Sequence, residues 1–261
     1  MRKLQLNDDV FLLPGEWNEL TTEQLLHLIK LVGKKLSAEE IKLKMLLKIL
    51  KARVHSYNGA DGKMLFVVKT EKKKYELSEE ELYSITAIFD YLFIEENGAI
   101  SINPLITKNP FPVLKVNYEI LEGAGEGLQD TTYERFIFLM TWFNQMLTEP
   151  ERINDFIAVL YKSDDEKVKP KHFGKLPQEV KTALTWYYLG CLAFMAEKFP
   201  ITFSGTGGSS SGRSVFENQM RVVDALSGND LTKKQIVKDS LLYDALFTLE
   251  IAAENAEKNK K

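Results

Sequence analysis

Apolar residues recur at helical spacing in most of the chain, and several of these runs begin with a residue typical of a helix N-terminus. Residues 20–35 and 37–52 form two such runs near the start. Ser37 stands three residues before Glu40, the spacing of a capping box, in which two side chains satisfy free backbone N–H groups at the helix start. The pattern therefore predicts two consecutive helices, and the same Ser-x-x-Glu spacing predicts a third over residues 78–93.

A short region of strands is predicted between the second and third helices. Residues 57–63 contain two turn signals, and residues 63–77 then form two short strands around a charged turn. The Lys72–Lys74 run in this turn is flanked by Glu71 and Glu76, so a solvated hairpin tip is favoured over a contact with nucleic acid.

Proline and glycine residues interrupt the helical pattern in the middle of the chain. Residues 97–120 contain Pro104, Pro110 and Pro112, which forbid a long helix and favour extended segments. The EGAGEG segment at residues 122–127 has the spacing Gly-x-Gly-x-Gly, which differs from the G-x-G-x-x-G of a dinucleotide-binding turn. We therefore expect this segment to be the hinge between an N-terminal α+β part and a C-terminal helical part.

The second half of the chain consists almost wholly of apolar helical runs. These runs cover residues 130–147, 149–162, 176–199, 214–228, 233–240 and 241–261. The pattern predicts a mainly α protein, in which an N-terminal α+β part contains a small β-hairpin and a C-terminal helical bundle follows. The predicted divisions are an α+β part at 1–122, a helical core at 128–200, a flexible Gly/Ser linker at 204–213 and a C-terminal helical arm at 214–261.

One of these helices is apolar on almost every side. Its apolar stretch, residues 183–196, is shorter than the roughly 20 residues that a membrane span needs, and charged residues follow it. A short helix of this kind is more simply explained by burial in a protein core. The run at 130–147 is likewise apolar on several sides, so we expect four large side chains of these two helices to lie in the C-terminal core: Trp142, Trp186, Leu189 and Phe194.

The composition is that of an ordinary soluble globular protein. Of 261 residues, 44% are hydrophobic and 27% are charged, and 34 basic against 37 acidic residues leave a net charge of −3. This balance gives no electrostatic reason to expect a nucleic-acid partner, although a local basic patch is compatible with it. Asn7, Asp8 and Asp9 stand where a signal peptide would need its apolar centre, so we expect a cytoplasmic protein without an export signal.

Few residues have the pattern of a chemical site. His27, His55 and His172 lie far apart in the sequence, and no metal-binding or nucleophile-elbow motif is present. Cys191 is the single cysteine and lies in an apolar run, where a small buried hydrophobe is favoured over a reactive nucleophile. A Ser, His and Asp group that only folding brings together stays open. We expect no enzyme activity, and no catalytic residue, metal or cofactor.

One glycine-rich stretch has the spacing of a phosphate-binding loop. Gly207 and Gly212 are followed by Arg213 and Ser214, so that arginine stands where such loops carry lysine. A phosphate loop also needs several β-α units in one sheet, whereas the segments that follow are helical. The stretch has the composition of a flexible linker, and we expect a tether without affinity for nucleotides.

The order of segments in the C-terminal half resembles that of a family of phage proteins. TTYERFIFLMTWFNQML is followed by DFIAVLYK, an aromatic helix that ends in KFPITF, a glycine-rich break and a long helical end that starts with VVDALSGNDL. The N-terminal LPGEWNELTTEQLLHLIKLV also fits. These segments are similar to those of small proteins from phages and prophages of Bacteroides-like bacteria, encoded near the tail tape-measure protein. The resemblance implies a tail assembly chaperone, which keeps the long tape-measure chain soluble until the tail tube polymerises around it.

The resemblance also implies the partner, which is the tape-measure protein or another tail component, and it carries no catalytic residues. Four leucines at helical spacing can pack on a partner or on their own domain, and the domain is favoured: Leu241, Leu242, Leu246 and Leu249. Two further functions stay open. One is a structural head-tail connector or baseplate adaptor of the virion, and the other is a helical nucleic-acid-binding regulator, which the charge balance disfavours.

Overall fold

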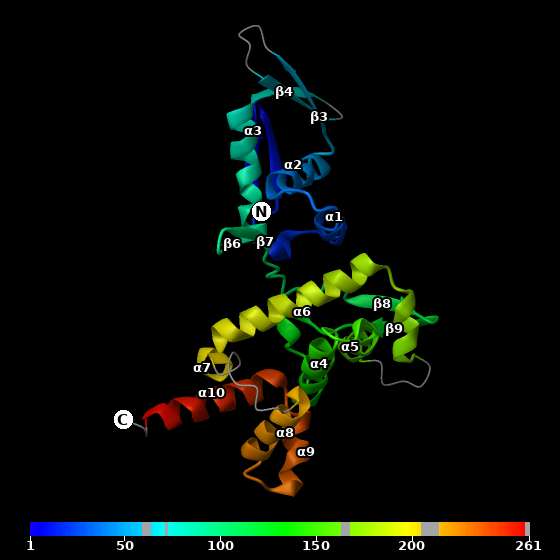
Figure 1. The fold of residues 1–261 in the computed structure, drawn as a ribbon, viewed down its shortest axis with the longest axis vertical. Helices are drawn as coiled ribbons and strands as arrows, with labels where there is room; N and C mark the ends of the chain where they lie inside the picture. Colours follow the sequence, from blue (N-terminus) through cyan, green and yellow to red (C-terminus); the bar gives the residue numbers. More distant parts are fainter. Residues whose placement is uncertain (59–63, 71–72, 163–167, 205–213, 259–261) are drawn as a thin grey trace. The chain divides into compact units, whose positions relative to one another are not determined.

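The computed structural model describes residues 1–58, 64–70, 73–162, 168–204 and 214–258 of the chain. The chain forms two compact units, Met1–Pro104 and Leu105–Lys261, whose element order is traced in Figure 1. The fold is mainly α, with small antiparallel hairpins in the N-terminal half and helices in the C-terminal half, and it confirms the predicted fold class.

The first unit combines antiparallel strands with three α-helices in its described part. The strands are β1 (Arg2–Leu6), β2 (Asp9–Leu13), β3 (Arg53–Asn58), β4 (Met64–Lys69), β5 (Lys74–Ser78), β6 (Phe93–Glu96) and β7 (Ala99–Ile102). The helices are α1 (Thr22–Val32), α2 (Ala38–Ile49) and α3 (Glu79–Thr86), with the 3-10 turns η1 (Trp17–Glu19) and η2 (Ala87–Leu92). Strand β1 pairs with β2, β3 to β5 form one sheet, and β6 pairs with β7.

Each α-helix of the first unit starts with a capping box. Thr21, Ser37 and Ser78 each accept a hydrogen bond from the backbone N–H three residues later, and the side chain of that later residue bonds back. The boxes at Ser37 and Ser78 are those that the sequence predicts. A cap of this kind typically stabilises a helix by about 1 kcal/mol. Behind the caps, the core is closed by fully buried side chains: Leu13, Leu25, Leu28, Met45, Phe89 and Leu92.

The predicted hairpin is the β4–β5 pair of the three-stranded sheet. Its charged turn is not only solvated, because Lys73 Nζ lies 2.7 Å from Asp9 Oδ2. The hydroxyl of Tyr75 donates a hydrogen bond to the same oxygen at 2.7 Å. Asp9 therefore joins this sheet to the β1–β2 hairpin. Residues 71–72 of the predicted tip lie outside the described residues.

The second unit is built mainly of helices. The longer ones are α4 (Tyr133–Gln145), α5 (Ile153–Leu160), α6 (Gln178–Lys198), α8 (Val215–Leu226), α9 (Leu231–Asp239) and α10 (Leu242–Lys258). Short helical segments are η3 (Glu126–Leu128), η4 (Pro150–Arg152), η5 (Pro170–Lys175) and α7 (Pro200–Ser204). Strands β8 (Val113–Val116) and β9 (Glu119–Glu122) form a hairpin in this unit.

The division between the units comes after Pro104, earlier than the predicted boundary at residue 122. The β8–β9 hairpin belongs to the second unit, where Leu114 and Val116 are buried. The prolines before this hairpin and the glycines after it both interrupt helical patterns. The sequence alone therefore does not decide which interruption separates the units.

The EGAGEG segment is a packed part of the second unit and not a hinge. Ala124 is buried, and its N–H donates a hydrogen bond to the carbonyl of Leu160 at 3.0 Å. The N–H of Gly127 donates to the carbonyl of Thr107 at 2.8 Å. A Cβ on Gly123 would lie only 2.5 Å from Asn109 Nδ2. These glycines therefore allow close packing rather than motion.

The four side chains predicted in the core are all half-buried, so this prediction is wrong for Trp142, Trp186, Leu189 and Phe194. The buried stripe of α6 consists of other residues, each of them fully inaccessible: Leu184, Tyr187, Tyr188, Cys191 and Met195. The reason is that α6 is apolar on nearly every side. A helix without polar positions gives no periodic signal for its inward face.

The predicted C-terminal arm at residues 214–261 packs into the second unit. The N–H of Leu242 donates to the carbonyl of Thr131 at 2.9 Å, and the N–H of Tyr133 donates to the carbonyl of Ser240 at 2.9 Å. These bonds join the start of α10 to the start of α4. Residues 205–213, which contain Arg213 and most of the predicted linker, lie outside the described residues.

Candidate partner-binding sites

The four leucines singled out from the sequence do not form one exposed surface. Leu242 and Leu246 are 0% and 2% exposed and pack into the second unit, Leu249 is half-buried, and Leu241 is 48% exposed. Leu242, Leu246 and Leu249 follow a helical period, and the buried Ala245 lies on the same side. This face of α10 therefore packs on its own domain.

The opposite side of α10 carries two exposed apolar residues that the leucine pattern misses. Phe247 is 62% exposed and Ile251 is 43% exposed. They stand four residues apart and therefore lie side by side, one helical turn apart. Their spacing was a usable signal, because both lie out of phase with the buried leucines. We call Phe247 and Ile251 the outer α10 pair.

Polar contacts fix the position of α10. Glu250 is 8% exposed, and its carboxylate accepts hydrogen bonds from the N–H groups of Ile201 at 2.9 Å and Thr202 at 2.7 Å. Burial alone would raise the pKa of this carboxyl, but these hydrogen bonds and one from the Thr202 hydroxyl lower it. Helix α10 therefore runs beside α7 and caps its first turn (Figure 1).

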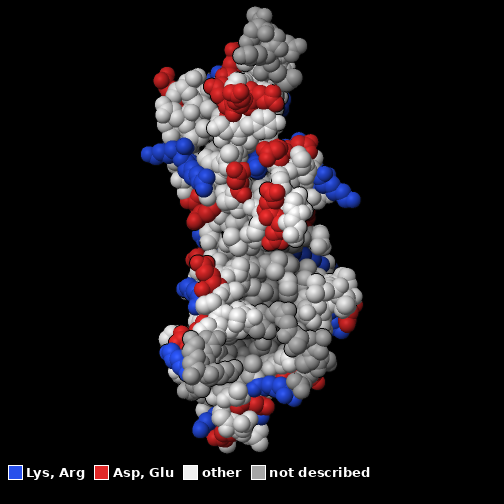
Figure 2. Space-filling model, turned by 60° about the vertical axis from the view of Figure 1, so that its left-hand side comes forward, with Lys and Arg blue, Asp and Glu red and all other residues white. Residues whose placement is uncertain are grey.

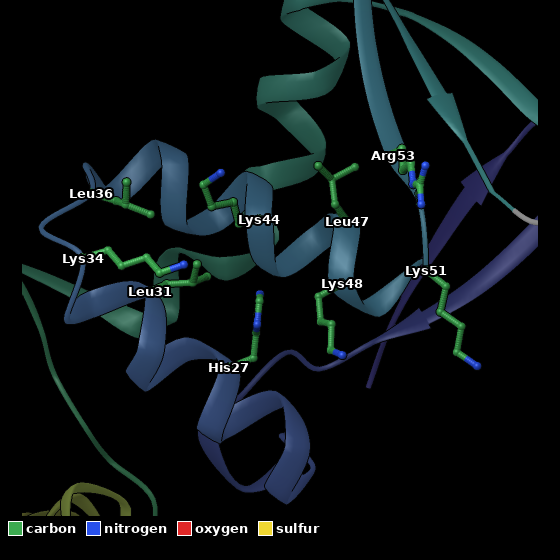
Figure 3. A pocket seen from close by; sticks show the side chains of 10 residues that line it. His27, Leu31, Lys34, Leu36, Lys44, Leu47, Lys48, Lys51 and Arg53 are labelled. Atoms are coloured by element: carbon green, nitrogen blue, oxygen red, sulfur yellow. The ribbon is translucent and has the colours of Figure 1, made fainter. Parts of the chain in front are cut away.

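A second candidate is a basic groove between α1 and α2 in the first unit, seen in Figure 3. Lys34 follows α1, Lys44 and Lys48 lie on α2, and Lys51 and Arg53 lie where α2 leads into β3. The cavity has a volume of about 810 Å³. We call it the α1–α2 groove.

Between these cations the α1–α2 groove is lined by apolar side chains. Leu31 is buried, and Leu36, Leu47 and Ala52 are half-buried. Leu31 lies on α1 and Leu47 on α2, so both helices contribute to the apolar floor. A ligand that fits this groove therefore needs apolar surface as well as negative charge.

The cations of the α1–α2 groove have few acidic neighbours. Lys48 Nζ lies 2.6 Å from Glu23 Oε1, and the hydrogen bond and charge of this lysine lower the pKa of that carboxyl. Among the described residues, no carboxylate lies within 4 Å of the charged groups of Lys34, Lys44, Lys51 or Arg53. On the face drawn in Figure 2, by contrast, the described Lys and Arg side chains are interspersed with Asp and Glu.

His27 reaches from α1 toward α2 within the groove (Figure 3). Burial lowers the pKa of His27, and the positive charges of Lys48, Lys34 and Lys30 lower it further. A hydrogen bond with the backbone of Lys44 acts in the opposite direction without cancelling these effects. The imidazole therefore takes up a proton less readily than an ordinary histidine, as expected for a partly buried group beside several cations.

The sequence interpretation did not identify the α1–α2 groove. A signal was present, because Lys44, Lys48 and Lys51 follow the helical spacing i, i+4, i+7 within a predicted helix. The spacing of these lysines does not indicate that α1 forms the other wall of the groove. That wall depends on how α1 packs against α2.

The remaining chemical candidates lie apart from both surfaces. His55 is exposed on β3, and His172 Nδ1 accepts a hydrogen bond from the N–H of Lys169 at 3.1 Å. Cys191 is fully buried, as the sequence predicts, and burial is the main reason that its pKa is raised to about 12. Among the described residues, no three His, Cys, Asp or Glu side chains gather as a group that could hold a metal ion.

None of the described helices combines the length and the apolar character needed to cross a membrane. Comparisons of the chain with protein-family profiles, with curated proteins and with solved structures gave no match.

Proposed function

We propose that the protein is a non-enzymatic phage tail assembly protein, a chaperone that binds the tape-measure protein in the cytoplasm of the bacterial host. The observation that carries the proposal is the outer α10 pair, Phe247 and Ile251, exposed on a helix whose other side is anchored in the protein. The order of helical segments along the chain, which resembles that of tail assembly chaperones, supports the same assignment.

The outer α10 pair suits the recognition of another helix. Side chains at i and i+4 are the usual anchors when one helix packs its apolar face against another. Helix α10 is already fixed by the buried Leu242 and Leu246 and by the hydrogen bonds of Glu250. A partner helix therefore meets a preformed surface, which lowers the entropic cost of binding.

The partner is tested by isolating the tagged full-length protein from phage-producing cells and identifying the bound proteins by mass spectrometry. We expect the wild-type chain to recover the tape-measure protein and Phe247→Asp/Ile251→Asp to lose it, because the charges oppose desolvation of the contact. The matched control is Val113→Asp/Ile120→Asp, since these residues of the β8–β9 hairpin are 54% and 71% exposed. Equal recovery by both double variants would contradict a role for α10.

The alternative function is tested on purified virions. A chaperone acts before the tail is complete and should be missing from the particle. Detection of this chain in virions at the level of a structural protein would overturn the chaperone proposal and favour a head-tail connector or baseplate adaptor.

A further inference from the structure

The α1–α2 groove belongs to the first unit and is separate from the site proposed on α10. We infer that this groove binds an acidic, amphipathic helical segment of a partner protein. The inference rests on the positive charges and the apolar lining of this groove. It holds whether or not the protein is a tail assembly chaperone.

The spacing of the cations favours an acidic helix. Lys44 and Lys48 stand at i and i+4 on α2, and Lys51 follows directly after the end of this helix, on the same rim of the groove. A second helix lying along α2 presents Glu or Asp side chains at the same spacing on one of its faces. Because Lys44 and Lys51 have no acidic partner within 4 Å among the described residues, they are available to pair with such carboxylates. Lys34 and Arg53 extend the positive rim beyond α2.

The floor of the groove favours a partner that is apolar as well as acidic. Leu47 lies on α2 between Lys44 and Lys51, and Leu31 faces the same cavity from α1. A purely acidic ligand would pair with the lysines but would leave the half-buried Leu47 partly in contact with water. An amphipathic helix covers both, since its apolar stripe lies beside its acidic residues. The volume of about 810 Å³ is within the range of pockets that hold ligands of several side chains.

Nucleic acid fits the same groove less well. Proteins that bind single strands stack bases on aromatic or Arg side chains, and those that read base edges use Arg, Asn and Gln. Arg53 is the single arginine among the lining residues, which include no Phe, Tyr, Trp, Asn or Gln. Lysines alone would contact a phosphate backbone, but the leucine floor would gain nothing from that contact.

The inference is tested by fluorescence anisotropy with the full-length protein and a labelled synthetic peptide. The probe has about five helical turns, with Leu and Glu at helical spacing. We expect saturable binding that Lys44→Gln/Lys51→Gln weakens by about tenfold or more and that added salt weakens further. Leu47→Ser should weaken it as well, because it removes part of the apolar floor. A peptide of the same composition in scrambled order should bind more weakly.

A matched control removes the same charge from lysines that do not line the groove. Lys171→Gln/Lys175→Gln changes two exposed lysines of η5 in the second unit and should leave peptide binding unchanged. Thermal melts of all variants establish that they fold like the wild-type protein. Perturbation of the methyl NMR signals of Leu31 and Leu47 by the peptide should place the contact in the groove.

Two results would overturn the inference. One is an absence of saturable peptide binding, or an equal loss in the control variant. The other is tighter binding of single-stranded or duplex DNA than of the peptide, insensitive to Leu47→Ser, which would identify a nucleic-acid site instead. Neither result affects the isolation of the tape-measure protein through Phe247 and Ile251, so the two proposals fail independently.

Discussion

The carboxylate of Glu250 in α10 accepts two hydrogen bonds from Thr202 in α7, one from the backbone N–H at 2.7 Å and one from the hydroxyl at 2.6 Å. These residues are separated by 48 positions in the sequence. A negatively charged group at the start of a helix accepts hydrogen bonds from the free N–H groups there and is attracted by the positive end of the helix dipole. Glu250 therefore couples the last helix of the chain to the end of the α6–α7 segment.

We expect Glu250→Gln to lower the melting temperature, because it replaces a charged acceptor with a neutral one. The pKa of this carboxyl is lowered in the folded protein, so its contribution to stability is present at neutral pH and is lost as the pH falls below about 4. The variant should therefore show a weaker loss of stability on acidification than the wild type. Melting curves over this pH range check the prediction.

The control for Glu250 is Glu254→Gln on the same helix, where the side chain is exposed. This substitution should leave both the melting temperature and its pH dependence nearly unchanged. If the two variants behave alike, the hydrogen bonds of Glu250 do not stabilise the fold.

Two adjacent tyrosines of α6 should respond differently to loss of the hydroxyl group. The hydroxyl of Tyr187 donates hydrogen bonds to the backbone carbonyls of Ala124 and Gly125, so Tyr187→Phe should reduce the free energy of unfolding by about 1–2 kcal/mol. The Tyr188 hydroxyl is buried without a hydrogen-bond partner among the described residues. Tyr188→Phe should therefore be neutral or stabilising. Denaturant unfolding of both variants measures the difference, and a reversed order would contradict the hydrogen-bond assignment.

Gly190 should tolerate no side chain. A Cβ at this position would lie 2.6 Å from the backbone N of Ile106 and closer still to its carbonyl oxygen. Gly190→Ala should therefore lower the free energy of unfolding by about 3 kcal/mol, because the backbone at Ile106 must move to admit the methyl group.

Gly33 provides the comparison for Gly190. It ends α1 with a helical φ of −62°, and a Cβ there would come no closer than 3.6 Å to another atom. Gly33→Ala should be neutral or stabilise the protein by up to about 1 kcal/mol through reduced freedom of the unfolded chain. A large loss in both variants of a denaturant series would show that the space around Gly190 is not the cause.

The lowered pKa of His27 predicts a pH effect near neutrality. As the pH falls through the ordinary pKa of histidine, about 6.5, the unfolded chain takes up a proton before the folded protein does. The contribution of His27 is therefore fully present above this pH and is lost below it. We expect His27→Gln to lose less stability than the wild type between about pH 7.5 and 5.5. An NMR titration that places His27 at or above its ordinary pKa would contradict this prediction.

Lys51 occupies a backbone conformation that favours glycine, with a φ of +49° after the end of α2. We expect Lys51→Gly to stabilise the protein by about 0.5–1 kcal/mol, because glycine has no Cβ to oppose this conformation. Lys51→Ala keeps the Cβ and removes the same charge, and it should show no such gain. Equal stability of the two variants in denaturant unfolding would exclude backbone strain as the explanation.

Local bonds explain why the sequence predicts the helix starts well. The caps of α1, α2 and α3 join residues only three positions apart, so the pair of residues that forms each cap can be recognised from the sequence. The same holds for the β4–β5 hairpin, whose strands are neighbours along the chain. The β1–β2 hairpin was not predicted, because its turn at Asn7, with a φ of +52°, carries no glycine.

Contacts between residues far apart in the sequence decided two features that its pattern left undetermined: the role of the EGAGEG segment and the inward face of α6. The glycines of EGAGEG indicate freedom of the backbone, but Tyr187 and Tyr243 donate hydrogen bonds to their carbonyls and hold the segment in place. Helix α6 is apolar all round, so only its neighbours determine that Tyr187 faces inward while Trp186 is half-buried.

The candidate sites follow the same rule. The sequence alone determined that Lys44 and Lys48 share a helix face and that apolar residues run along α10. Only the packing of α1 against α2 turned those lysines into the rim of a groove, and only the packing of α10 left Phe247 outside while it buried Leu246. Periodicity places residues on a common face of a helix, whereas the elements that cover the helix decide which face meets water.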